Sequence, residues 1–189
     1  MIRSLLCLCI LGLLAPRQAL AEVQDELRQT QERIADLHEG KDEYKAALKI
    51  WRELLAAHPK ELRYLDRVSE IACDLEQYEV ALPAARTLTR LAPNEPRYVA
   101  RLAAALLGLK RHAEAVKHLR WMLARKPGSL ELHRELAHAH EATSDYKAAL
   151  REYDWLLARD PNNVDDHHAR ADILGELDRS SAQRAALLL

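Results

Sequence analysis

The 189-residue sequence contains no phenylalanine, only 5 glycines, and no long stretch in which β-branched and polar residues alternate. Such alternation is typical of a half-buried strand, so its absence argues against a β-sheet. Alanine, leucine, glutamate and arginine dominate instead, and these are strong helix formers. We therefore predict an all-α protein that is long enough for one ordinary domain with a sizeable core.

An excess of charge of one sign is also missing, because the formal net charge is −1. A nucleic-acid-binding surface needs clustered Lys and Arg, so we expect no nucleic-acid partner. The sequence motifs HExxH, CxxC, GxSxG and the phosphate-binding loop do not occur. We therefore expect no enzymatic activity and no cofactor.

Cysteine is scarce, and two of the 3 cysteines, Cys7 and Cys9, lie in an N-terminal segment that differs from the rest of the chain. Residues 1–21 combine Arg3, an apolar run over residues 5–15, and a small-x-small pattern at residues 19–21. This is the layout of a cleavable secretory signal, and the run is shorter than the roughly 20 residues that span a bilayer. An uncleaved short anchor and a wrongly assigned start are the alternatives.

Cleavage of residues 1–21 would remove two arginines and no acidic residue, which changes the net charge from −1 to −3. The remaining chain has one cysteine, Cys73, so no internal disulfide is available and its stability must come from packing. We expect an exported protein, periplasmic or associated with the cell envelope, that has no membrane span after signal removal.

The main positive feature of the sequence is a period of 34 residues. Residues 44–59 and 146–161 are nearly the same stretch, and 102 positions, or three periods, separate them. A fixed period in this range is typical of a solenoid. Prolines recur at 59, 93, 127 and 161, alanines recur at 47, 81, 115 and 149, and small residues recur at Ala35, Ser69, Ala103, Ala137 and Ala171.

These columns resemble those of the tetratricopeptide repeat (TPR) superfamily, in particular its exported bacterial members. Residues 130–161 carry the pattern of that family at Leu136, Ala137, Tyr146, Ala149, Tyr153 and Pro161. The resemblance implies a right-handed α-solenoid of stacked antiparallel helix pairs over residues 22–189. We identify four full repeats, about 28–61, 62–95, 96–129 and 130–163, and an incomplete fifth at 164–189.

Packing explains the columns. Small side chains let two helix backbones approach to about 8–10 Å where they cross. Each proline ends a helix, because the residue before a proline is pushed out of helical geometry. Bulky residues are expected to fill the space around the crossings, namely Tyr44, Trp51, Tyr78, Leu119, Tyr146 and Tyr153.

Three features depart from the pattern. Pro83 lies inside an expected second helix, where it removes a backbone hydrogen bond, and we predict a kink or soft spot there. Arg170 stands where other repeats carry an aliphatic residue, which suits an end repeat that faces water. An apolar stripe formed by Val23, Leu27, Ile34 and Leu37 is either a leading cap or a short partner-binding helix, and we favour the cap.

Nine histidines raise the question of a metal site. His133 and His140 are seven residues apart and share a helix face, but that face is expected to be packed, and His138 points elsewhere. We therefore predict packing histidines and no metal site.

The resemblance implies that the first helix of each repeat lines a groove that binds a protein or peptide segment. Carried over to this sequence, the groove positions form an acidic set, Glu32, Asp36, Asp66, Glu70 and Asp74, and a basic set, Arg97, Arg101, Arg134 and His138. Complementary charge would fix the direction of a bound segment. The alternative is an ordinary solvated face.

We therefore predict a non-catalytic protein–protein interaction scaffold or adaptor of the periplasm or cell envelope, acting in export, secretion or envelope assembly. A second hypothesis is the N-terminal TPR arm of a larger envelope protein, such as an exopolysaccharide-export outer-membrane protein. A third is a TPR helper in cytochrome maturation. Self-association through terminal helices is a further expectation.

Overall fold

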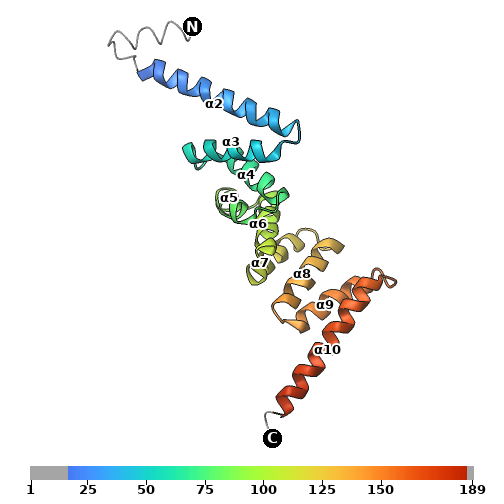
Figure 1. Ribbon diagram of the computed structural model, residues 1–189. Coiled ribbons are helices and arrows are strands. Elements are labelled where there is room, and N and C mark those ends of the chain that lie inside the picture. Colours follow the sequence, from blue (N-terminus) through green and yellow to red (C-terminus); the bar gives the residue numbers. More distant parts are fainter. Residues whose placement is uncertain (1–16, 187–189) are drawn as a thin grey trace. The chain divides into compact units, whose positions relative to one another are not determined.

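The structure is a computed structural model that describes residues 17–186, and the secondary structure of this range is entirely helical (Figure 1). Residues 1–16 of the predicted signal segment lie outside the described residues, whereas residues 17–21 form the start of the first helix. The helices are α2 (Arg17–Glu39), α3 (Tyr44–Ala57), α4 (Leu62–Asp74), α5 (Tyr78–Leu91), α6 (Pro96–Gly108), α7 (His112–Leu123), α8 (Leu130–Ala142), α9 (Tyr146–Leu157) and α10 (Val164–Ala186).

The helices follow one another in pairs, and the pairs recur with the predicted 34-residue period. Helices α4, α6, α8 and α10 begin at the residues where repeats two to five were expected to begin. All four prolines of the 34-residue column lie in turns between helices, at 59, 93, 127 and 161. Among residues 17–186, no helix combines the length and the apolar character that crossing a membrane requires.

The turn inside each helix pair also follows the period. Its central residue has a left-handed backbone conformation, with φ between 56° and 59°, at Asp42, Glu76, Lys110 and Ser144. The N–H of the next residue donates to a carbonyl five residues earlier, at 2.8 Å from Arg111 to Leu106 and at 2.9 Å from Asp145 to His140. This is the Schellman turn that ends many helices, in which glycine is the usual central residue.

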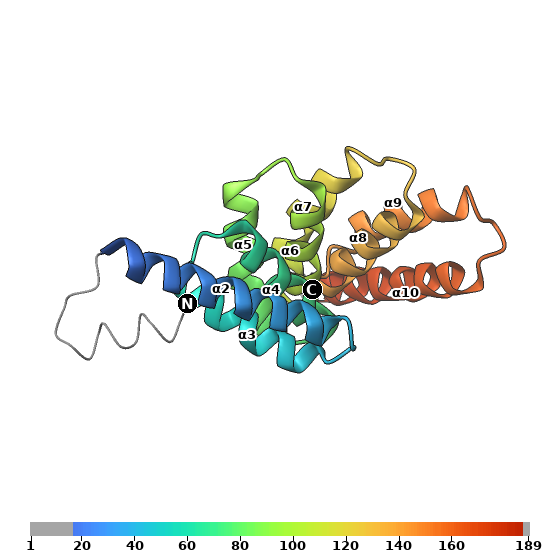
Figure 2. The same cartoon turned by 90° about the horizontal axis from the view of Figure 1, so that it is seen from above.

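The chain divides into two compact units, and the boundary lies between Ile71 and Ala72, within α4. The first contains α2, α3 and most of α4, and α3 lies along one side of α2 (Figure 1). The second contains the end of α4 and α5–α10. In this second unit α9 packs against both α8 and α10 (Figure 2).

The small-residue columns form the core. The alanines at 47, 81, 115 and 149 are fully buried, as are Ala35, Ser69 and Ala137. The buried hydroxyl of Ser69 donates to the carbonyl of Asp66 at 3.0 Å, so it has the partner that burial requires. Ala171, in the last repeat, is exposed.

Most of the predicted bulky residues pack as expected. Trp51, Leu119 and Tyr153 are fully buried, and Tyr146 packs against the cluster around Tyr153. The prediction for Tyr44 is wrong. Its ring is exposed and its hydroxyl donates to Asp42 Oδ1 at 3.0 Å, because Tyr44 is the first residue of α3 and lies beside the turn.

The leading stripe is not a cap. Helix α2 is one continuous helix of 23 residues, and Val23, Leu27, Ile34 and Leu37 are all exposed on it. These side chains therefore do not cover the first repeat. Instead α2 packs on α3 through a different face, which contains the fully buried Ala35.

Pro83 lies within α5, which stays helical from Tyr78 to Leu91. Its ring is exposed, and its carbonyl accepts a hydrogen bond from Thr87 Oγ1 at 2.9 Å. Because proline has no N–H, one hydrogen bond of this helix cannot form. The kink or soft spot expected here stays a prediction.

Candidate interaction surface on the first helices

All nine predicted groove residues lie on the first helices of the pairs, α2, α4, α6 and α8. Glu32, Asp66 and Arg134 occupy equivalent places in their repeats, and Asp36, Glu70 and His138 follow one helical turn later. The third repeat has alanine at both places, Ala100 and Ala104, and Ala104 is exposed. These equivalent positions therefore change along the chain from carboxylates in the first two repeats to alanines in the third and to Arg134 and His138 in the fourth.

In the first unit, α4 holds the two carboxylates of α2. Glu32 accepts a hydrogen bond from Arg63 Nη1 at 2.7 Å and one from the hydroxyl of Tyr64, and Asp36 accepts one from Arg63 Nη2 at 2.8 Å. Burial raises the pKa of Tyr64 to about 12, and its hydrogen bond to Glu32 adds to the rise. These contacts join residues 27 to 32 positions apart, so they tie successive first helices together.

A second set of contacts, which the sequence analysis missed, centres on Arg67 and Glu39. Glu39 Oε1 accepts from Trp51 Nε1 at 2.5 Å and from Arg67 Nε at 3.1 Å, and Arg67 Nη1 lies 2.5 Å from Glu70 Oε2. The only available signal was that Arg63 and Arg67 are four residues apart and so share a helix face. With half-buried Asp66, the carboxylates outnumber the two arginines on this face.

In the second unit, Arg134 has a partner within the chain. Its Nε and Nη2 each donate to one carboxylate oxygen of Asp166, both at 3.0 Å, and Asp166 is buried. This bidentate bond raises the pKa of Arg134. The amide of Asp166 in turn donates to Asn163 Oδ1 at 2.9 Å, which fixes the start of α10. Arg134 therefore links α8 to the first turn of α10.

The other basic positions of this unit differ in their exposure. Arg97 is exposed, and its guanidinium lies 4.7 Å from the ring centre of Tyr98 and donates to the Tyr98 hydroxyl at 2.9 Å. Arg101 is half-buried, and this burial lowers its pKa. His138 is exposed, and its Nδ1 lies 3.2 Å from the hydroxyl of Tyr153. Asp74 is exposed at the end of α4.

His133 and His140 pack inside the second unit, as the sequence predicted. The ring of His133 stacks on Trp155 with centroids 3.4 Å apart, while Glu152 Oε2 lies 2.6 Å from its Nδ1. His140 Nε2 lies 3.3 Å from Arg120 Nη2. Within residues 17–186, no group of three or more His, Cys, Asp or Glu side chains is arranged to hold a metal ion.

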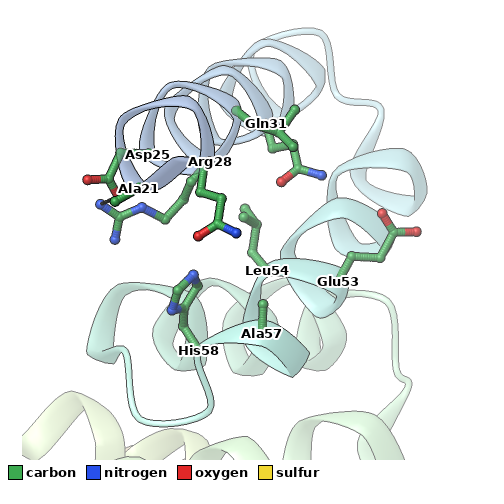
Figure 3. Close-up of a pocket in the computed structure, with 10 residues that line it drawn as sticks. Ala21, Asp25, Arg28, Gln31, Glu53, Leu54, Ala57 and His58 are labelled. Atoms are coloured by element: carbon green, nitrogen blue, oxygen red, sulfur yellow. Dashed lines mark ion pairs between the residues drawn. The ribbon is translucent and has the colours of Figure 1, made fainter. Parts of the chain in front are cut away.

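A pocket of about 460 Å³ lies between the first half of α2 and the end of α3 (Figure 3). Arg28 and Asp25 form an ion pair at 3.1 Å on its α2 side, and His58 closes it at the end of α3. Small-molecule sites are mostly apolar with a few convergent polar groups. This open pocket does not match that description, because its lining mixes aliphatic and charged residues: Ala21, Gln24, Asp25, Leu27, Arg28, Gln31, Glu53, Leu54, Ala57 and His58.

Comparison with known families agrees with the period and with the helix pairs. A sequence model of the tetratricopeptide repeat matches residues 106–173, which run from the end of α6 into α10. Residues 106–173 therefore contain tetratricopeptide repeats. No curated protein matches its sequence.

Solved TPR structures are similar in fold. MamA from Desulfovibrio magneticus RS-1 superposes with a TM-score of 0.67 at 17% identity, over 84% of this chain and 91% of that one. A tetratricopeptide repeat protein from Parabacteroides merdae gives a TM-score of 0.60 at 16% identity, over 84% of this chain and 62% of that one. The fold is therefore an all-α solenoid of helix pairs. TPR proteins are generally non-catalytic, and the TPR fold supports a role as a protein–protein interaction scaffold.

Proposed function

We propose that this TPR protein is a non-catalytic scaffold of the periplasm or cell envelope that binds an extended segment of a partner protein along its first helices. The observation that carries this proposal is the face of α6 and α8. On α6, Arg97 and Arg101 lie near two small residues, Ala100 and Ala104. On α8, His138 occupies the position equivalent to Ala104, one repeat later. Small side chains let a partner backbone come close, and the neighbouring cations attract carboxylates.

The charges of this face indicate the chemistry of the partner segment. On the first helices of the second unit Arg97 and His138 are exposed, whereas Arg134 is bound to Asp166. A segment with acidic side chains fits this part. The acidic face of the first unit, around Glu32 and Asp36, suits a segment with basic side chains.

The proposed location rests on residues 1–21, whose charged start, apolar run and small-residue end are typical of an export signal. Export is tested by cell fractionation of the full chain, followed by sequencing of the N-terminus of the recovered protein. A periplasmic protein that begins at Glu22 supports the location, and a cytoplasmic protein that begins at Met1 contradicts it.

Partner capture tests the binding face. The variant Arg97→Glu/His138→Glu places two carboxylates on α6 and α8, and its control, Arg90→Glu/Arg151→Glu, changes two exposed arginines on the second helices α5 and α9. We expect partners captured from a periplasmic extract to bind the first variant about tenfold more weakly than the wild type, since each exposed ion pair contributes up to about 1 kcal/mol. Equal capture by both variants contradicts the proposal.

A further inference from the structure

Helix α2 carries an exposed apolar seam. Five of its aliphatic side chains have exposed fractions of 41–60%: Leu20, Val23, Leu27, Ile34 and Leu37. Their spacings, with Thr30 in the one remaining place, alternate between three and four residues. This is the a and d pattern of a coiled coil, with a at 20, 27 and 34 and d at 23, 30 and 37.

The α2–α3 contact is centred on a different face, although Leu27 of the seam also lines the open pocket beside that contact. Ala35, one residue beyond Ile34, is fully buried, and consecutive residues of a helix point about 100° apart. Glu39, on the same side as Ala35, bonds Trp51 of α3 at 2.5 Å. Nothing within the described part of the chain covers the seam, because all five of its aliphatic side chains are exposed.

Two charges flank the seam on the side away from α3, and they are opposite in sign. Glu26 and Arg33 occupy successive g positions of the heptad, and both are exposed. In an antiparallel pair of α2 helices, g positions face g positions, so Glu26 of each copy faces Arg33 of the other. In a parallel pair g faces e, so Glu26 would face Gln31 and Arg33 would face His38. Neither of these pairs joins a carboxylate to a cation.

The same antiparallel register fits the apolar residues. It brings Val23 opposite Ile34 of the second copy and Leu27 opposite Thr30, each twice by symmetry. The Thr30 hydroxyl already donates to the carbonyl of Glu26 at 2.8 Å, so it needs no partner at the seam. Leu37 lies opposite Leu20, and this outermost layer alone would change if the chain were cleaved before Glu22.

From the seam and the flanking charges we infer that α2 binds a second copy of this chain, forming an antiparallel two-helix coiled coil with twofold symmetry. A second copy fits because the complementary charges lie on one and the same helix. This inference is independent of the partner segment proposed for the first helices of the second unit.

The first test is the mass of the purified full chain in solution, measured by light scattering over a range of concentrations. We expect a dimer, and we expect Leu27→Glu to give a monomer with unchanged helix content. The matched control is Leu91→Glu, at a similarly exposed leucine at the end of α5, and it should stay dimeric. A monomeric wild type overturns the inference. The seam would then be covered by residues 1–16 or would bind another protein.

Charge exchange tests the register. Glu26→Arg and Arg33→Glu each place like charges opposite one another, so each variant should dimerise at least tenfold more weakly than the wild type. The double variant restores both pairs and should dimerise like the wild type. An equimolar mixture of the two single variants should form heterodimers, because every facing pair is then opposite in charge. If the double variant stays as weak as the single ones, or if the mixture stays monomeric, the antiparallel pairing is wrong.

Discussion

Cys73 illustrates how burial controls a single residue. It lies half-buried in α4, and its sulfur is 4.0 Å from the carbonyl oxygen of Arg101. Burial raises the pKa of its thiol to about 11, and the charge of Asp74 adds to the rise. Since the thiolate is the reactive form, its fraction at pH 8 should be roughly 100-fold lower than that of an ordinary thiol.

We therefore predict that Cys73 reacts slowly with a thiol reagent at pH 8 in the folded protein. In denaturant, where the thiol is solvated, labelling should be at least tenfold faster. The measurement is the rate of labelling with Ellman's reagent under both conditions, in a Cys7→Ser/Cys9→Ser variant in which Cys73 is the remaining thiol. A native rate equal to the denatured rate would show that Cys73 is freely accessible as a thiolate.

The central residues of the four turns have left-handed backbone conformations, which affect stability residue by residue. A residue with a side chain costs about 1–2 kcal/mol in this conformation, whereas glycine loses about 0.5–1 kcal/mol of backbone entropy on folding. Replacing Lys110, whose φ is 56°, by glycine should thus raise the free energy of unfolding by about 0.5–1 kcal/mol.

Denaturant unfolding of Lys110→Gly measures this gain. The matched control is Lys117→Gly, which places glycine inside α7 and should lower the free energy of unfolding by about 1 kcal/mol. A loss of stability in both variants would mean that the turn at Lys110 does not favour glycine.

His140 makes stability depend on pH. Its ring, on α8, is buried, and this burial lowers its pKa, although the charge of Asp145 opposes the shift. The unfolded chain, with an ordinary histidine pKa near 6.5, therefore binds a proton at a higher pH than the folded chain. Folding is favoured above pH 6.5, and this advantage is lost as the pH falls toward the lowered pKa.

We expect the free energy of unfolding to fall between pH 7.5 and pH 5, and the variant His140→Gln to show a smaller fall. Urea unfolding at several pH values gives both slopes. Identical slopes for the wild type and the variant would contradict the role assigned to His140.

Helices α5 and α6 come into close contact at Gly108. A Cβ atom placed there would lie 2.4 Å from two ring carbons of Tyr78, so the ring would have to move. Gly108→Ala should lower the free energy of unfolding by about 1–3 kcal/mol, the usual cost of overpacking.

Thermal or denaturant unfolding of Gly108→Ala checks this contact. Gly128→Ala is the matched control, because no atom lies within 4 Å of its added Cβ, and its stability should stay close to that of the wild type. Equal effects of the two substitutions would show that Tyr78 does not restrict Gly108.

Helix positions and core columns could be predicted from the sequence because a 34-residue period repeats one packing solution. The alanines at 47, 81, 115 and 149 are buried in every repeat, and the column prolines lie in turns. The left-handed turns could not be recognised, since the four central residues are Asp, Glu, Lys and Ser and share no side-chain chemistry. Nor could a single sequence show that α2 exposes its apolar stripe, because an amphipathic pattern does not say what covers it.

The candidate surface could be predicted only as a set of positions. Its residues do lie on the first helices, but their pairing depends on contacts between residues about one repeat apart. Arg63 with Glu32 and Arg134 with Asp166 are examples, at separations of 31 and 32 residues. Charge pairs at such distances look like unrelated surface residues in the sequence.

Along the whole chain, equivalent positions of the first helices carry different residues and make different contacts from one repeat to the next. In a solenoid each repeat contacts only its neighbours, so stability is approximately a sum over repeats and their interfaces. Carboxylates and arginines of successive first helices serve these interfaces, as Glu32, Arg63 and Asp166 show. In the proposed function, the alanines of the third repeat, Ala100 and Ala104, are the part of this face that a partner contacts.

If a partner segment lies along the first helices, photo-crosslinking in living cells should capture it there. A photoreactive phenylalanine derivative would replace Ala104, exposed on α6, and in a separate strain Lys117, exposed on α7. We expect a crosslinked partner protein from position 104 and none from position 117. Crosslinks of equal yield from both positions, or from position 117 alone, would contradict it.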